Sequence, residues 1–374
     1  MNEAETAVHP RKQAGYHVGG PMFDTSGKVI QAHGGGLLYE NGVYYWFGEN
    51  KEYTLGDGKI WTYGINCYSS TDLINWKNEG LIIPPDTENP HSSLHPSKPL
   101  DRPHILHCRK TGKYVCWLKL SENDAYFVVL TADAITGPYT IVRDRIHPYG
   151  VRVGDFDLWQ DEAGNGYIFF EHDHNGIFAA TLTDDFLDIT EPHTDMFTGL
   201  KPPYTREGVT HFVHNGKHYL LTSGMSGYIP NPSEVAVSDV PLGPYRVLGN
   251  PHRNDPSGAS CNSQISAILQ HPQNPELYLT LADRWIPSLV MTADIWDKLC
   301  VGFRALEKHR WLFHLREIAL MGKMPWQCNK INTSLAEYVW LPLHFEGDMP
   351  VIDCTSNENE VHHECNSLKS EVSL

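Results

Sequence analysis

The amino-acid sequence predicts an all-β protein, a five-bladed β-propeller with a helical insertion before its last strands. Three observations lead to this fold class: a strand–turn–strand unit recurs five times, a second and weaker hairpin follows most copies, and helical periodicity is absent before residue 285. Two hairpins make four antiparallel strands, which is one propeller blade. We expect one propeller domain over residues 16–353, with the insertion at 289–336 and flexible termini at 1–15 and 354–374.

The first unit is QAHGGGLLYENGVYYWFGEN, from Gln31 to Asn50. Two strand-like runs, LLY and VYYWF, flank Asn41-Gly42, and this is the strongest short-range signal for a β-hairpin. The hairpin ends at Glu49, so a carboxylate lies at the end of its second strand. Its first strand opens with Ala-His-Gly-Gly-Gly, where the backbone can approach another group closely because no side chains intervene.

The same unit returns as RPHILHCRKTGKYVCWLK, DFDLWQDEAGNGYIFFEH, GVTHFVHNGKHYLLTSG and SQISAILQHPQNPELYLTLADRW. The turn residues of the five units are Gly42, Gly112, Gly164, Gly216 and Asn274. The second hairpins read NCYSSTDLINW, VVLTADAITGPYTIV, AATLTDDFLDIT and VAVSDVPLGPYRVL. A β-sandwich also contains many short strands, but it does not normally repeat an internal four-strand unit, and the propeller is therefore favoured.

The last unit is interrupted by residues 289–336. In VMTADIWDKLCVGFRALEKHRWLFHLREIALMGK the apolar residues recur at spacings of three and four, which predicts one or two helices. Strand-like alternation returns in EYVWLPLHF, and the polar residues after Cys354 are expected to fray.

Composition limits the classes of ligand. The formal net charge is −16 and no basic stripe is present, which argues against nucleic acid or an anionic membrane and suits a neutral ligand. No apolar run is long enough to span a bilayer, and the first fifteen residues lack the apolar segment of a secretory signal. We therefore expect a cytoplasmic protein, and a mature secreted protein whose leader has been removed is the alternative. The sequence indicates no oligomeric state.

The eight cysteines show no Cys-x-x-Cys spacing. We interpret them as reduced thiols, most of them in the core, rather than as a disulfide or zinc framework. No cofactor and no metal site is expected, because no segment has the oxygen-ligand pattern of a calcium loop.

Polar residues open the innermost strand of each predicted blade. In a propeller these strands line the central axis, so their starts should meet at one end of it. The starts carry His33, Asp101-Arg102, Asp155 with Asp157, Arg206-Glu207 and Asn262-Ser263-Gln264. Aspartate and asparagine also form turns, so any single position has a purely structural explanation, but glutamate is not a preferred turn residue.

A convergent cluster of this kind suits the hydrolysis of a glycosidic bond. One protonated carboxyl donates its proton to the leaving oxygen, and a second group activates water or attacks the anomeric carbon. A neighbouring carboxylate raises the pKa of the acid by charge repulsion. Aromatic side chains near the strand ends, among them Trp117, Tyr228 and Trp285, could stack on sugar rings, although most buried tryptophans belong to the core.

These segments resemble glycoside hydrolase family 43, and within it the exo-β-1,3-galactanase group and its neighbours. The resemblance rests on AHGGGLLYENGVYYWFGENK, YSSTDLINWKNEG, RPHIL, DFDLWQDEAGNGY, REGVTHF, SQISAI and DRW. It implies a five-bladed propeller and an inverting mechanism. By position, Glu207 matches the general acid, Asp155 the carboxylate that raises the pKa of the acid and orients it, and Gln264 a glutamine that positions water.

Most of the family carries its catalytic base at the start of the first inner strand, where this chain has Gln31-Ala32-His33-Gly34 and no carboxylate. The galactanase group shares that absence, and there the resemblance gives the positioning of water to Gln264. Glu49 or Asp101, acting through a water molecule, is the alternative candidate for the base. The predicted substrate-binding residues are His33, Glu49, Asp101, Arg102, Trp117, Tyr228, Asn262 and Trp285. Asp101 stands where the group carries glutamate, Lys119 where histidine is common, and Tyr228 where tryptophan is usual.

We therefore expect a glycosidase, an exo-acting and inverting hydrolase of O-glycosyl bonds. Its best-matched substrate is terminal β-1,3-linked galactose in plant-type oligosaccharides. An α-L-arabinofuranosidase, β-xylosidase or galactofuranosidase of the same family is the nearest alternative, because pocket shape decides the sugar. A catalytically silent carbohydrate-binding propeller and a protein-interaction propeller are the alternatives from other classes.

Overall fold

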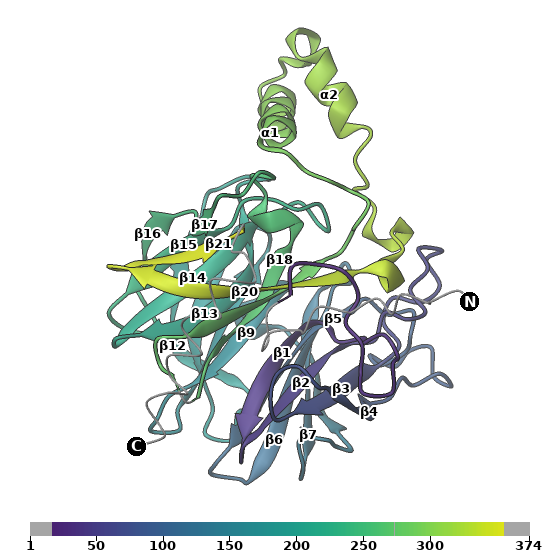
Figure 1. The fold of residues 1–374 in the computed structure, drawn as a ribbon, viewed down its shortest axis with the longest axis vertical. Coiled ribbons are helices and arrows are strands. Elements are labelled where there is room, and N and C mark those ends of the chain that lie inside the picture. The colour runs from purple at the N-terminus through teal and green to yellow at the C-terminus, as the bar shows by residue number, and fades with distance from the viewer. Residues whose placement is uncertain (1–16, 273, 355–374) are drawn as a thin grey trace, which may run out of the picture.

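The computed structural model describes residues 17–272 and 274–354 and shows a five-bladed β-propeller (Figure 1). Each predicted unit forms one antiparallel sheet, and the fold expected from the sequence is confirmed. The predicted flexible termini, apart from Cys354, lie outside the described residues.

The blades follow one another along the chain. Blade one consists of β1 (His33–Glu40), β2 (Val43–Glu49), β3 (Ile65–Ser70) and β4 (Lys77–Ile83). Blade two consists of β5 (Leu100–Cys108), β6 (Lys113–Leu120), β7 (Tyr126–Ala132) and β8 (Thr140–Ile146). Blade three consists of β9 (Val153–Gln160), β10 (Gly166–His172), β11 (Gly176–Leu182) and β12 (Ile189–Met196). Blade four consists of β13 (Arg206–His214), β14 (Lys217–Gly224), β15 (Glu234–Ser238) and β16 (Arg246–Gly249).

Blade five consists of β18 (Gln264–Gln270), β19 (Tyr278–Arg284), β20 (Glu337–Glu346) and β21 (Met349–Asp353), with the short β17 (His252–Arg253) parallel to β21. Short 3₁₀ turns lie at Pro148–Gly150, Ser260–Asn262, Trp311–Phe313, Cys328–Lys330 and Thr333–Leu335.

The hairpin turns have the backbone that the sequence predicts. Asn41 and Gly42 have φ of 52° and 84°, and Asn215 and Gly216 have φ of 49° and 74°. Positive φ at both central residues matches the right-handed twist of the flanking strands, which is why Asn-Gly is favoured there.

Apolar side chains pack between neighbouring blades. One cluster fills each of the five interfaces, and the cluster between blades five and one contains Trp46, Trp76 and Trp340. The ring also closes through polar contacts at the axis. His33 Nδ1 lies 2.8 Å from Asp283 Oδ1, and the amide of Gly34 donates to Asp283 Oδ2 at 2.9 Å.

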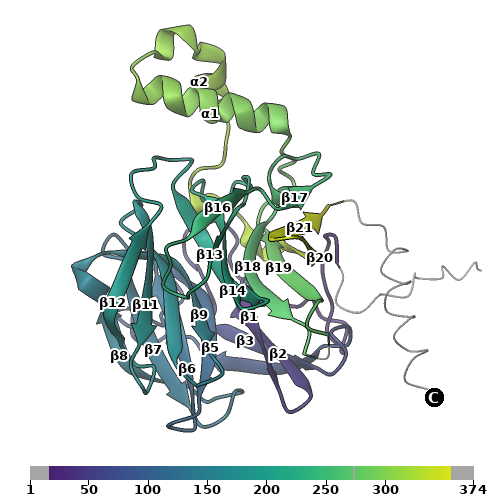
Figure 2. The ribbon, with the colours of Figure 1, turned by 90° about the vertical axis from the view of Figure 1, so that its left-hand side faces the viewer.

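The predicted helical insertion lies between β19 and β20. It contains α1 (Ala293–Glu307) and α2 (Leu315–Met321), which project from the blades as a pair (Figure 2). The side chain of Thr292 caps α1 by accepting from the amide of Ile295. Trp296, Leu299 and Met321 pack with Ile229 from the propeller, so the helices are anchored beside the fourth blade. Among the described residues, no helix is long and apolar enough to cross a bilayer.

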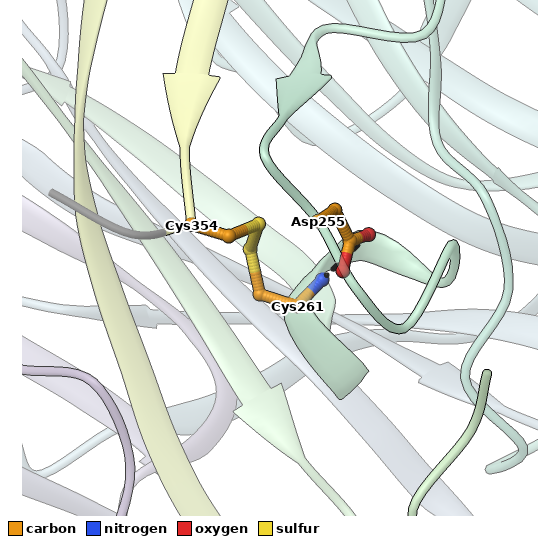
Figure 3. Close-up of side chains that lie close together, drawn as sticks. All are labelled: Asp255, Cys261 and Cys354. Atoms are coloured by element: carbon orange, nitrogen blue, oxygen red, sulfur yellow. Dashed lines mark hydrogen bonds between the residues drawn. A yellow bond between two sulfur atoms is a disulfide. The ribbon is translucent and has the colours of Figure 1, made fainter. Parts of the chain in front are cut away.

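The expectation that all cysteines are reduced is wrong for one pair. Cys261 and Cys354 form a disulfide with 5.8 Å between their Cα atoms (Figure 3). It joins the end of β21 to the loop before β18, two segments that only the closed ring brings together. Cys67, Cys108, Cys116, Cys300 and Cys328 are free, and Cys365 lies outside the described residues.

Candidate active site

A pocket of about 360 Å³ lies where the predicted strand ends meet. Each blade contributes at least one predicted residue to its wall: Glu49, Asp101, Asp155, Glu207 and Gln264, in blade order. Arg102, Tyr228 and Trp285 complete the predicted residues that line it. The convergence expected from the strand starts is therefore present in the structure.

A β-bulge at the pocket end of each innermost strand directs these side chains. The pairing register shifts between His33 and Gly36 in β1, and within the first residues of β5, β9, β13 and β18 as well. A bulge adds one residue to a strand and turns the neighbouring side chains, and such bulges recur beside active sites. In β5 and β13 the residue after the carboxylate has a positive φ, which is 55° at Arg102 and 59° at Gly208.

Asp155 is held as a carboxylate by three donors. Arg102 Nη2 donates to its Oδ2 at 3.0 Å, Lys119 Nζ donates to its Oδ1 at 2.6 Å, and the amide of Gly208 donates to Oδ2 at 3.1 Å. Burial by itself raises the pKa of Asp155, but the two cations and the hydrogen bonds outweigh it and hold the pKa well below its usual range.

Glu207 is in the opposite electrostatic state. Burial is the largest influence, and the negative charges of Asp155 and Glu171 add to it, which raises the pKa of Glu207 from 4.5 to about 8. Lys119 and Arg102 oppose this shift without reversing it. At neutral pH the pocket therefore presents a protonated carboxyl beside an ionised one, the division of roles that acid catalysis requires.

A second pair of carboxyls lies on the side of blades one and two. Glu49 accepts from the amide of Arg102 at 3.0 Å and pairs with Lys51 Nζ at 2.6 Å. Its pKa is raised to about 7, because burial and the charge of Asp101 together exceed the effect of Lys51. Asp101 accepts from Trp61 Nε1 at 2.5 Å and from Ser121 Oγ at 2.7 Å, so its carboxylate is fixed at the pocket wall.

Gln264 is oriented by two neighbours. Its Nε2 donates to Ser223 Oγ at 2.9 Å, and its Oε1 accepts from Trp285 Nε1 at 3.3 Å. A Cβ on Gly208 would lie 3.0 Å from Gln264 Nε2, so glycine at position 208 allows the amide to lie beside the catalytic strand. One lone pair of Oε1 and one hydrogen of Nε2 are left for a water molecule or a substrate hydroxyl.

Three predicted substrate-binding residues do not line this pocket. His33 is fully buried and stacks on Tyr338 with ring centroids 4.7 Å apart, so it supports the ring closure behind the pocket. Trp117 is fully buried in the core between blades two and three, where its Nε1 donates to the carbonyl of Phe186. Asn262 accepts from the amide of Met291 at 2.7 Å and holds the start of the insertion.

Other pocket residues were missed as binding residues. Lys119 was noted only as a departure from the family pattern, and it proves to be the closest cation to Asp155. Trp61 forms an aromatic wall with Tyr228, 6.1 Å between ring centroids, and Tyr228 in turn lies 4.7 Å from Trp285. Cys328 comes from the insertion, and no sequence signal placed it at the pocket.

One group of possible metal ligands lies close together among the described residues: Asp255, Cys261 and Cys354 (Figure 3). Its two sulfur atoms are bonded to each other, and the Asp255 carboxylate accepts from the amides of Ser257 and Cys261. The donors of this group are thus already engaged in holding the loop before β18.

Comparisons with known proteins agree with this geometry. The model of glycosyl hydrolases family 43 matches residues 36–263. Among curated proteins, an arabinoxylan arabinofuranohydrolase from Paenibacillus polymyxa is 25% identical over 253 residues, which cover 57% of this chain and 39% of that protein.

Two solved structures are similar over most of the chain. A family-43 β-1,3-galactosidase has a TM-score of 0.70 at 26% identity and covers 91% of this chain and 61% of its own. An exo-β-1,3-galactanase from Phanerochaete chrysosporium, solved with β-1,3-galactotriose, has a TM-score of 0.69 at 24% identity and covers 89% and 65%. The chain spans less than two thirds of the length of each of these three relatives. The family expected from the sequence is confirmed.

Proposed function

Since the chain belongs to glycosyl hydrolase family 43, we propose that it is an exo-acting, inverting glycosidase that releases one terminal sugar, with β-1,3-linked galactose as the substrate of choice. The observation that carries this proposal is the pairing of a protonated Glu207 with an ionised Asp155 in one small axial pocket. Both carboxyls face the same cavity, so one monosaccharide can contact both.

In this mechanism Glu207 donates its proton to the glycosidic oxygen. Its raised pKa, about 8, keeps it protonated at neutral pH, and leaving-group protonation lowers the barrier to cleavage of the bond. Asp155 stays ionised, and through its hydrogen bond to the amide of Gly208 it fixes the strand that carries the acid. Its negative charge also favours the positive charge that develops on the sugar ring.

The attacking water would lie beside Gln264. An amide is a poor base at neutral pH, so its contribution is to orient the water through the free lone pair of Oε1, while the carboxylates stabilise the transition state. Glu49, whose pKa is raised to about 7, is the nearby group that accepts the proton of the attacking water through a second water molecule.

The shape of the pocket favours the end of a saccharide chain. At about 360 Å³ it is small, and Trp61, Tyr228 and Trp285 form a continuous aromatic side. Such a side suits the apolar face of a pyranose, and the polar groups of the opposite side suit its hydroxyls. The choice of galactose as the proposed sugar is based on the similarity to the β-1,3-galactosidase, which is 26% identical to this chain.

The experiment that tests this proposal is a panel of aryl glycosides, with β-D-galactoside, α-L-arabinofuranoside and β-D-xyloside as the arms, together with β-1,3-galactobiose. We expect release of galactose, with a loss in kcat/KM of about 10²–10⁴ in Glu207→Gln. The anomer formed first, followed by proton NMR, should have inverted configuration. Net retention or undiminished activity of Glu207→Gln contradicts the mechanism, and preference for arabinofuranoside would point to the specificity of the curated relative.

The cytoplasmic location expected from the sequence stays a prediction. The disulfide between Cys261 and Cys354 bears on it, because protein disulfides persist mainly in oxidising compartments. Fractionation of the producing cell, with peptide mapping of the two cysteines, tests the location and the disulfide together.

A further inference from the structure

A second and larger groove lies in the first blade, outside the pocket described above. Its volume is about 730 Å³, twice that of the pocket, and none of its lining residues belongs to the proposed catalytic set. Four amide side chains and three tyrosines contribute to its wall: Gln31, Asn50, Asn66, Asn78, Tyr53, Tyr63 and Tyr68.

The loop between β2 and β3, residues 50–64, separates the groove from the pocket. Trp61 lines the pocket, whereas Tyr53 and Tyr63 of the same loop line the groove. Glu49 and Asn50 are consecutive residues that face the pocket and the groove respectively. The two cavities are thus neighbours that share one wall.

The wall is rigid because a buried lysine holds it. Lys51 is fully buried, and its Nζ donates to the carbonyl of Trp61 at 2.9 Å and to Thr62 Oγ1 at 2.8 Å. The amide of Lys51 also donates to Gln31 Oε1 at 3.2 Å, which orients the Gln31 side chain in the groove. A preorganised polar wall loses little entropy when a ligand binds.

The chemistry of the groove fits a neutral polyhydroxylated ligand. Among the described residues, the side-chain nitrogens of Gln31 and Asn50 donate to no protein acceptor, whereas the oxygens of both accept from backbone amides. Amides of this kind both donate and accept, as vicinal hydroxyls require. Tyr53 and Tyr63 pack edge to face, 4.8 Å between centroids, and Tyr53 is 45% exposed, so a ring face is open to solvent.

Charge adds no preference for an ion. Lys28 and Glu52 are the two charged residues of the groove, and their charges are opposite. We propose that this groove is a non-catalytic binding site for a neutral oligosaccharide, and that it holds the part of the saccharide chain that lies outside the catalytic pocket. The identity of the ligand as an oligosaccharide rests on the proposed function, and the location of the binding site rests on the lining of the groove.

A second site of this kind acts through effective concentration. A chain that is bound in the groove presents its end to the adjacent pocket, so long substrates gain affinity while small aryl glycosides gain none. Tyr53→Ala with Tyr63→Ala should therefore raise KM for β-1,3-galactan about tenfold and leave kcat/KM for the aryl glycoside unchanged. The double Tyr→Phe variant keeps both rings and should retain the KM of the original protein.

Tyr149→Ala is the matched control, because Tyr149 is 36% exposed and its hydroxyl contacts the outermost strand of blade three. Equal losses on the polymer and on the aryl glycoside would overturn the proposal, since they would place the effect in the pocket. A KM for the polymer that does not change in the double alanine variant would overturn it too.

A direct measurement needs no substitution in the groove. In the Glu207→Gln variant, with galactose at saturating concentration in the pocket, isothermal titration with β-1,3-galactan and arabinoxylan oligosaccharides should show one remaining site. Absence of that site for both oligosaccharides refutes the groove, whatever the hydrolysis assays show. Binding without hydrolysis by the unsubstituted protein would instead support the groove and refute the proposed activity.

Discussion

Replacement of Asp155 by asparagine tests the electrostatic design of the site. The pKa of Glu207 is raised from 4.5 to about 8, first by burial and then by the charges of Asp155 and Glu171. Asp155→Asn removes one of these charges and leaves Arg102 and Lys119 without their shared carboxylate partner. Both changes favour the ionised form of Glu207, so its pKa falls.

The size of the effect follows from the structure. A neighbouring charge moves a carboxyl pKa by about 1–3, and burial of Glu207 is unchanged, so the pKa should fall from about 8 to between about 5 and 7. A general acid is active only while protonated, and activity is lost as the pH rises through its pKa. The basic limb of the kcat/KM profile should therefore move to lower pH, and activity at pH 7.5 should fall more than activity at pH 5.

The assay is the pH profile of kcat/KM with an aryl β-galactoside between pH 4 and 9. Asp157→Asn is the control, because Asp157 lies on the same strand but accepts from the amide of His211 at 2.7 Å and does not line the pocket. A basic limb that stays near pH 8 in Asp155→Asn would show that Asp155 does not set the protonation of Glu207, and the reasoning would be refuted.

Three further predictions concern the support of the site. Gly208→Ala should lower kcat/KM about 10²-fold, since its new Cβ would lie 2.6 Å from Ser223 Oγ and 3.0 Å from Gln264 Nε2, and residue 208 has φ of 59°; kinetics with the folded variant checks this. Cys261→Ser should lower the free energy of unfolding by about 4–5 kcal/mol, the loop-closure entropy of a 93-residue separation, and urea denaturation with intact circular dichroism of the native state measures it. Lys51→Met should destabilise the fold by about 3–5 kcal/mol, because it leaves Glu49 buried without its cation. Since the pKa of Glu49 is raised in the folded protein, its contribution to stability is lost as the pH rises, and the loss in the variant should be larger at pH 8 than at pH 5. Equal losses of unfolding free energy at the two pH values would contradict this prediction.

Much of the site could be predicted because it follows from position along a repeated unit. Once the five hairpins are recognised, Glu207, Asp155 and Gln264 each open an innermost strand, and equivalent positions of a propeller converge on the axis. The residues of the turns are enough to recognise the hairpins. Asn41-Gly42 and Asn215-Gly216 adopt the positive φ values that their sequence favours.

The predicted residues that do not line the pocket show what the sequence leaves open, because a side chain at a strand start can point to either side of the sheet. His33 occupies the same kind of position as Asp101 and Glu207, yet its ring turns toward Asp283 and Tyr338 and is fully buried. The bulges decide which residue of each start faces the pocket, and a bulge is visible only when the partner strand is in place. Trp117 shows the same limit, because alternation does not reveal which blade covers it.

The sequence by itself determined the repeat, the blades and the position of the helical insertion, because these depend on contacts between residues close together in the chain. The roles of Glu207 and Asp155 came from the resemblance to the family, since the two residues lie far apart in the chain and no local contact pairs them. Only the tertiary structure decided that Lys119 and Arg102 pair with Asp155 and keep it ionised, that Cys261 forms a disulfide with Cys354, and that Cys328 lines the pocket. The physical reason is that charge state, burial and cross-linking depend on distances in space, and the closed ring brings together residues that are far apart in the chain.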